Sequence, residues 1–219
     1  MADSLTPWLV WEGPYPAYYL PLADVRAELI EEGPGRVSSS RGASTAYTVK
    51  VDGAQAPGAA LRYLDSPVEE LRGLVRLDWN SMDAWFEEDE EVHVHPRSPF
   101  VRVDVLASSR QVRVEVDGVT VAESSSPRIL FETGMPTRYY LPKPDVRMDL
   151  LEKSETGTGC PYKGQAEYWS VRAGDTVHKD LAWSYPTPLP ESRDVAGLVC
   201  FYSEKLDIYV DGVLQQRPG

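Results

Sequence analysis

The sequence has 219 residues, 42% of them hydrophobic and 26% charged, the balance of a globular protein with enough apolar side chains for two small cores. Its 22 Lys and Arg residues and 34 Asp and Glu residues give a formal net charge of -12, which repels nucleic acid phosphates and anionic membrane surfaces. There is no apolar run of signal-peptide or membrane-spanning length, and Met1–Ser4 carries no basic leader. We therefore expect a cytoplasmic protein that binds neither nucleic acid nor membrane.

Helix signals are few and short. Residues 21–31 place apolar side chains at i, i+3 and i+7 after a proline, and residues 142–152 repeat that spacing. Ser66–Glu69 forms a capping box with a proline in the first turn, and Gly73 can end the helix that it starts. Residues 190–196 are the equivalent segment later in the chain. We predict a short helix at each of these four places.

Strand signals dominate the rest of the chain. Residues 101–105, 112–116 and 206–210 alternate apolar and polar side chains, which is the period of a sheet with one face in solvent. Asp117-Gly118, directly after the second of these runs, is typical of a tight β-hairpin turn. We predict an α+β fold that is mainly antiparallel β.

One pair of histidines has a spacing that can chelate a metal. His93-Val94-His95 would place two imidazoles on one face of a strand. No third ligand such as cysteine is nearby, so we expect an exposed strand here, no metal site and no cofactor.

The chain is a tandem duplication. Residues 18–32 are identical to residues 139–153 at nine of fifteen positions, among them Tyr-Tyr-Leu-Pro and Asp-Val-Arg. Matches continue in the same order from Pro7–Glu12 with Pro127–Glu132 through to Met82–Trp85 with Leu206–Tyr209. A repeat of this length is about right for a small domain. We predict two pseudo-symmetric domains, residues 1–99 and residues 100–219.

The two ends of the repeat are not equivalent. The second copy opens with a strand at residues 112–119, whereas no such strand precedes Trp8. Residues 206–213 resemble that opening strand, so we predict that the last strand, within residues 206–214, returns to complete the sheet of the first copy. Arg26 and Arg147, which each follow Asp-Val, are interpreted as partners of nearby acids.

Several short motifs of the second copy resemble the DUF427 family. They lie in order at residues 116–124, 140–142, 160–164, 182–185 and 197–201. The resemblance covers nearly all of residues 112–210, and more weakly residues 7–95. It implies two tandem β-tent-like domains, similar to the Mss4-like superfamily. The first copy has Ser38–Gly42 where the second has Gly159–Gly164, so it is the degenerate copy and we expect one site per chain.

The loop around Cys160 is the sharpest catalytic candidate. Pro161 favours an extended conformation at Cys160, and Lys163 lowers the pKa of the thiol if the two side chains converge. Cys160 is then a nucleophile or redox residue, while Lys163 anchors an anion or forms a Schiff base. The alternative is a structural loop, with Cys160 packed and Lys163 in solvent.

Aromatic residues of the second copy are candidates for a ligand pocket. A concave wall of rings can hold a flat or cationic molecule, although a β-rich domain also needs aromatic core. The candidates are Tyr140, Tyr162, Tyr168, Trp183 and Tyr185. Trp183 and Tyr185, two residues apart, would face the same side of a strand.

Two functions remain open at this level. The first is a domain that binds or converts a small anionic or aromatic molecule, with one pocket framed by the rings, Cys160 and Lys163. The second is a non-catalytic scaffold that binds another protein through its acidic surface and sheet edges. A solvent-open pocket into which Cys160 or Lys163 points would favour the first function, and a filled core would favour the second.

Overall fold

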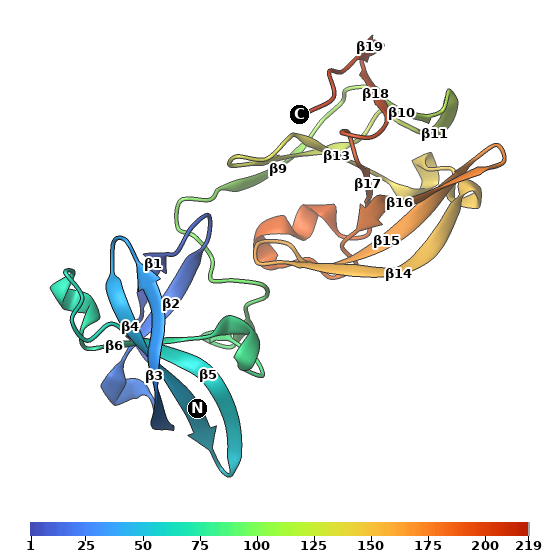
Figure 1. Ribbon diagram of the computed structural model, residues 1–219. Helices are drawn as coiled ribbons and strands as arrows, with labels where there is room; N and C mark the ends of the chain where they lie inside the picture. The colour runs from blue at the N-terminus through green and yellow to red at the C-terminus, as the bar shows by residue number, and fades with distance from the viewer. Residues whose placement is uncertain (219) are drawn as a thin grey trace. The chain divides into compact units, whose positions relative to one another are not determined.

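The computed structural model describes residues 1–218 and divides the chain into two compact units, Met1–Ser98 and the part from Pro99 onward. Figure 1 shows both as strand-rich units with long hairpins and short helical turns. Among residues 1–218, none of the helices has the length and apolar character needed to cross a membrane.

The first unit is built on one antiparallel sheet, in the order β1-β2-β6-β5-β4-β3. Its strands are β1 (Trp8–Trp11), β2 (Pro16–Pro21), β3 (Glu28–Ser38), β4 (Gly42–Val51), β5 (Ala54–Arg62), β6 (Leu74–Leu77), β7 (Phe86–Glu87) and β8 (Glu90–Glu91). β7 and β8 form a separate small hairpin. Short 3₁₀ helices cover Leu22–Asp24, Glu69–Leu71 and Trp79–Ser81.

The second unit contains a seven-stranded and a four-stranded sheet. Its strands are β9 (Val103–Ala107), β10 (Val112–Val116), β11 (Val119–Ser124), β12 (Arg128–Glu132), β13 (Arg138–Leu141), β14 (Leu151–Cys160), β15 (Gly164–Ala173), β16 (Thr176–Ser184), β17 (Val199–Phe201), β18 (Asp207–Val210) and β19 (Val213–Leu214). Its 3₁₀ helices cover Lys143–Asp145, Met148–Leu150 and Pro190–Val195.

The two large sheets share one topology. The order β12-β13-β17-β16-β15-β14 in the second unit repeats β1-β2-β6-β5-β4-β3 of the first. The second unit adds β9, which pairs antiparallel with the edge strand β12. This confirms the mainly antiparallel α+β fold and its pseudo-symmetric duplication.

Alternation along the strands creates a core on each face of the large sheets. In the second unit Leu141, Ala182 and Val199 belong to one buried cluster, and their neighbours Tyr140 and Trp183 belong to another. The first cluster also contains residues of β10 and β18, so the four-stranded sheet covers that face. Four of the five aromatic candidates, Tyr140, Tyr168, Trp183 and Tyr185, lie on the opposite face.

Tight turns set the register of the hairpins. Asp117 and Gly118 join β10 to β11 and both have positive φ, at 49° and 78°. This is the backbone of a type I′ turn, whose twist matches the flanking strands. The predicted hairpin is therefore confirmed.

The predicted helices at residues 21–31 and 142–152 are wrong beyond their first turns. Only Leu22–Asp24, Lys143–Asp145 and Met148–Leu150 are helical, and the chain then enters β3 or β14. β3 and β14 pair along their length with β4 and β15. Hairpin pairing and burial override a weak local preference for helix. The short helices predicted near Glu69 and at 190–196 are confirmed as 3₁₀ turns.

The last strand belongs to the second copy. β18 pairs antiparallel with β10, for example Val114 with Ile208, and not with a strand of the first unit. The prediction that residues 206–214 complete the first copy is wrong.

The His93-Val94-His95 segment is not a strand, in contrast to the prediction. Val94 has a φ of 73°, which an extended chain does not adopt. His95 stacks on Tyr15, with ring centroids 4.2 Å apart. No group of three or more metal-ligating side chains occurs within residues 1–218.

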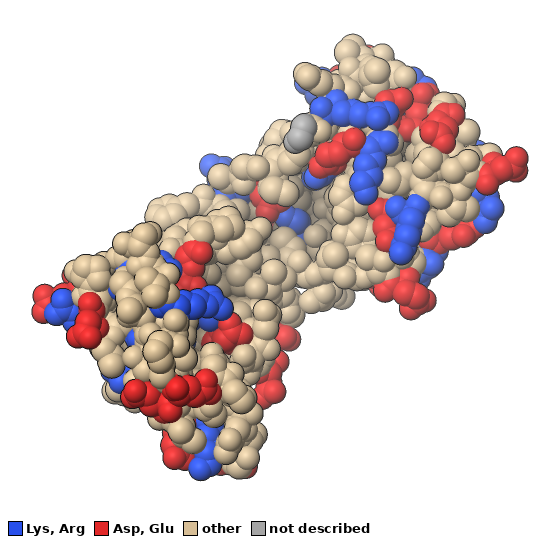
Figure 2. Space-filling model, viewed as in Figure 1, with Lys and Arg blue, Asp and Glu red and all other residues tan. Residues whose placement is uncertain are grey.

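Acidic and basic side chains lie side by side on the visible face of each unit (Figure 2). Many of them form exposed ion pairs, such as Lys50 with Glu28 at 2.9 Å and Lys153 with Glu167 at 3.0 Å. Pairs of this kind contribute little stability each. The net acidity is therefore spread over a mixed surface.

Candidate functional site

Five of the seven predicted site residues come together in one cluster. Tyr140 from β13, Tyr168 from β15, Trp183 from β16 and Tyr185 just beyond it form a buried group, with Cys160 packed against its edge. Trp183 and Tyr185 share a face, as predicted. The cluster also contains Leu130, Ala166, Val195 and Cys200.

The rings of this cluster contact one another. Trp183 Nε1 donates a hydrogen bond of 3.2 Å to the Tyr140 hydroxyl, and the two rings meet edge to face at 87°. The Tyr168 hydroxyl lies 3.0 Å from the Thr158 hydroxyl. Tyr140 is 1% exposed and Trp183 7%, and burial raises the pKa of Tyr140 well above its usual value. The arrangement is that of a packed aromatic core whose polar atoms are paired internally.

The loop that carries the catalytic candidates is a turn between β14 and β15. Leu189 N–H donates to the Lys163 carbonyl at 3.2 Å, and Ser192 Oγ donates to the Tyr162 carbonyl at 3.2 Å. Gly164 has a φ of 92°, and a Cβ there would lie 3.4 Å from a backbone oxygen. Tyr162 is buried in this turn. The loop is thus fixed against Leu189 and the 3₁₀ helix Pro190–Val195 that follows it.

Lys163 is held by an acid that sequence reasoning missed. Its Nζ lies 2.5 Å from Glu132 Oε2, and both side chains are nearly buried, at 10% and 11% exposure. Glu132 is the last residue of β12 and is distant in sequence. A ligand anion would have to displace this carboxylate to reach Lys163. That Lys163 binds an anionic ligand stays a prediction. The ion pair with Glu132 argues against it.

The first copy retains the same charge pattern at this place. Glu12 and Arg41 correspond to Glu132 and Lys163, and Ser38 faces Gly42 across the hairpin as Cys160 faces Gly164. Here Glu12 accepts a 2.5 Å hydrogen bond from the Tyr19 hydroxyl and pairs with Arg76 at 3.2 Å. The acid is thus paired with a base in both copies, but the base differs, and the tyrosine contact is one that Glu12 makes.

The two cysteines occupy different environments. Cys160 is partly exposed, whereas Cys200 is fully buried. Both cysteines are free thiols. Burial raises the pKa of the Cys200 thiol to about 12. Only Cys160 is placed to meet a reagent from solvent, and its catalytic role stays a prediction.

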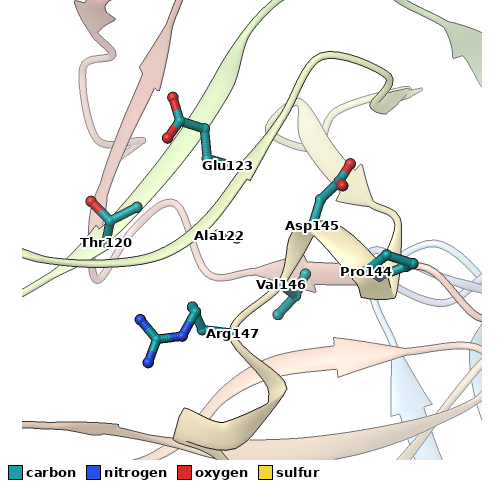
Figure 3. A pocket seen from close by; sticks show the side chains of 7 residues that line it. All are labelled: Thr120, Ala122, Glu123, Pro144, Asp145, Val146 and Arg147. Carbon is teal, nitrogen blue, oxygen red and sulfur yellow. The ribbon is translucent and has the colours of Figure 1, made fainter.

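A different part of the second copy presents a solvent-open hollow of about 380 Å³ (Figure 3). One side comes from β11 and the other from the 3₁₀ turn that follows β13. It is lined by Thr120, Ala122, Glu123, Pro144, Asp145, Val146 and Arg147. Figure 3 shows Thr120 and Arg147 toward one end of the hollow and Asp145 and Pro144 toward the other.

Backbone contacts fix the two walls of the hollow. Ala122 and Val146 form an antiparallel bridge, and Arg147 N–H donates to the Val121 carbonyl at 2.9 Å. Ser124 Oγ donates to Asp145 Oδ2 at 2.6 Å, which orients that carboxylate. The side chain of Val146 is buried, so the residues on either side of it point outward.

Charges of both signs surround the hollow. Arg147 donates to both oxygens of Asp149, at 2.9 and 2.6 Å, and this contact lowers the pKa of Asp149. The Arg147 and Asp149 side chains are 57% and 61% exposed, so their pairing is weak and open to exchange. Glu123 accepts a 3.1 Å hydrogen bond from Gln111.

Sequence reasoning missed this site although it contained the signal. Asp-Val-Arg recurs at residues 24–26 and 145–147, and we interpreted the arginines as partners of nearby acids. That interpretation is confirmed for Arg147. It is wrong for Arg26, whose side chain forms no ion pair or hydrogen bond with residues 1–218. The recurrence of Asp-Val-Arg in both copies was the available clue.

The shared sheet order and the repeated Asp-Val-Arg segment define a tandem of two small β domains that descend from one unit. The chain belongs to the family described as a domain of unknown function, DUF427, whose model matches residues 1–88 and 104–212. This confirms the resemblance and agrees with the duplication. Comparison with curated proteins gives no match. Membership of the β-tent-like or Mss4-like superfamily stays a prediction.

Proposed function

We propose that this protein binds a small polar molecule in the hollow between β11 and the Asp145–Arg147 segment. The observation that carries the proposal is that exposed Arg147 and Glu123 and half-buried Asp145 line a concave surface. The volume of about 380 Å³ lies within the range of small-molecule sites, near its lower end. The proposal concerns binding, and chemistry at Cys160 is a separate prediction.

The charges around the hollow indicate the class of ligand. Arg147 offers a planar pair of donors that suits a carboxylate, and Thr120 adds a hydroxyl at the same end. Glu123 and Asp145 would repel a simple anion but can hold an ammonium group. Exposed Pro144 provides apolar contact, whereas Ala122 and Val146 are buried beneath the hollow. A compact zwitterion, such as a free α-amino acid, satisfies all three parts.

The composition of the chain bears on the compartment in which the protein acts and on the partners that it avoids. Two free cysteines and a net charge of -12 are compatible with a reducing cytoplasm and with a protein that avoids nucleic acid. The proposal therefore includes a cytoplasmic location and the absence of nucleic-acid binding.

Titration calorimetry with the standard L-amino acids tests this proposal. We expect saturable binding of one or a few of them to the wild type, and at least a tenfold loss of affinity at the second-copy site in Arg147→Gln, because a charge-assisted bidentate contact is lost. Arg172→Gln is the matched control, since Arg172 is also exposed and paired with a surface acid, Glu152. It should bind like the wild type.

Two results would contradict the proposal. Equal losses of affinity in Arg147→Gln and Arg172→Gln would show that the loss comes from the change in net charge and not from a contact with Arg147. Absence of binding at millimolar ligand would favour the alternative, a protein-interaction module. That alternative is supported by edge strand β1, which carries exposed Trp8 and Trp11, whereas its counterpart β12 is covered by β9.

A further inference from the structure

We propose that the first copy carries a second site for the same class of ligand, formed by Asp3, Asp24 and Arg26. This inference rests on the proposed function, because it takes the ligand class from the hollow of the second copy. It replaces the expectation of one site per chain, which was based on the loss of the Cys160 loop from the first copy, where Ser38–Gly42 stands instead. The chain would then bind two ligand molecules, one in each domain.

The backbone of the two places is the same. Ala2 bridges Val25 in the first copy as Ala122 bridges Val146 in the second. Arg26 N–H donates to the Met1 carbonyl at 2.9 Å, which matches the 2.9 Å bond from Arg147 to Val121. Residues 1–4 therefore stand where residues 121–124 stand in β11.

The orienting hydrogen bond is also repeated. Ser4 Oγ donates to Asp24 Oδ2 at 2.5 Å, as Ser124 Oγ donates to Asp145 Oδ2 at 2.6 Å. A serine four residues from the start of the chain and an aspartate in a 3₁₀ turn have no local reason to keep this contact. It holds the carboxylate in the same place in both domains.

The exposed charges follow the same pattern. Asp3 takes the place of Glu123, with the same sign and a side chain one methylene shorter, and Arg26 takes the place of Arg147. Asp3 and Arg26 are both exposed. The first copy therefore presents two carboxylates and one guanidinium at the positions equivalent to the charged groups of the hollow, with Ala23 in place of Pro144 and without a counterpart of Thr120.

Arg26 is more available to a ligand than Arg147. The counterpart of Asp149 is Glu28, and Glu28 is engaged by Lys50 at 2.9 Å. The guanidinium of Arg26 consequently has no partner within residues 1–218. An arginine that is retained in both copies but paired inside the protein in only one is therefore open to a common role toward a ligand.

Calorimetric stoichiometry tests the inference, with the amino acid that binds the wild type as the probe. We expect two sites per chain in the wild type, one in Arg147→Gln, one in Arg26→Gln and none in the double variant. Arg172→Gln should keep two sites. All three arginines are exposed, so circular dichroism should report an unchanged fold in each variant.

The outcomes separate this inference from the proposed function. One site in the wild type, lost in Arg147→Gln and unaffected by Arg26→Gln, would overturn the second site and leave the proposed function standing. Absence of binding in the wild type would overturn both. Two sites that persist in Arg26→Gln would place the additional ligand elsewhere and overturn the inference.

A second variant tests the same site without removing its arginine. Lys50→Gln frees Glu28 to pair with Arg26, which creates in the first copy the competition that Asp149 provides in the second. We expect the affinity of the first site to fall several-fold while the second site is unchanged. An unchanged first site in Lys50→Gln, together with an ineffective Arg26→Gln, would contradict a role for Arg26.

Discussion

At the scale of single residues, exposure decides which charged groups can meet a ligand. Lys163 and Arg147 are both basic and both paired with an acid, but Lys163 is 10% exposed and Arg147 is 57% exposed. Separating the buried pair leaves Glu132 charged and poorly solvated, which costs about 3–5 kcal/mol. The exposed pair exchanges at a cost of about 1 kcal/mol or less. A ligand can therefore recruit Arg147 far more readily than Lys163.

The same contrast predicts the reactivity of the two thiols. We expect iodoacetamide at pH 8 to alkylate Cys160 in the native protein and to leave Cys200 unmodified, as read by peptide mass spectrometry. Cys200 is fully buried, and its pKa of about 12 leaves roughly one thiolate in ten thousand at that pH.

Two controls define this measurement. Denaturant should expose both thiols, and Cys160→Ser should leave the native protein unlabelled. Comparable native rates at Cys160 and Cys200 would show that the aromatic face of the second copy opens in solution. That result would support the aromatic cluster of the second copy as a ligand pocket.

Sequence alone predicted much of the residue-level grouping and little of its chemistry. Tyr140, Tyr168 and Trp183 were expected together and do lie together, because strand alternation and the repeat fix which side chains share a face. Glu132 was not predicted as the partner of Lys163, since a pair between the end of a strand and a turn distant in sequence leaves no local pattern. Arg147 was dismissed because an ion pair was a sufficient explanation for it.

At the scale of elements, hairpins override the helical spacing of residues 21–31 and 142–152. The apolar period there is matched over only two turns, too few to stabilise an isolated helix. β3 instead pairs with β4 along most of its length, from Glu28 with Lys50 to Ser38 with Gly42. Strands with clean alternation, such as 112–116, were predicted to the residue. Where the local pattern fits both a helix and a strand, the structure can be predicted only if the partner strand is known.

The final strands give an element-scale prediction. Removing the residues after Glu204 should unfold the second copy, because it deletes Leu206, Ile208 and Val210 from the core and leaves β10 without one of its partners. Burial of three such side chains stabilises the fold by roughly 5–9 kcal/mol, which is comparable to the whole stability of a small domain. Amide NMR spectra of the truncated chain provide the measurement.

The first copy serves as the internal control for this truncation. Its buried clusters are formed by residues of the first unit alone, so its amide signals should keep their dispersion. Loss of those signals, with the second copy intact, would mean that the last strand serves the first copy in solution.

At the scale of the whole molecule, duplication explains both the shared and the divergent features. The six-strand order is common to both copies, and so are the Asp-Val-Arg segment and the Glu12 and Glu132 positions. The four-stranded sheet belongs to the second copy. In the first, Met82 and Trp85 pack on the corresponding core, and Trp85 stacks on Trp79 at 5.0 Å. The sequence revealed the repeat, but not which repeated residues face solvent.

Residue-resolved NMR titration tests the central claim most directly. The account predicts that the bound amino acid shifts the amide signals of Ala122, Glu123, Val146 and Arg147, and leaves those of Cys160 and Lys163 unchanged. Shifts confined to the Cys160 loop and the aromatic cluster, with the Asp145–Arg147 segment unaffected, would contradict it.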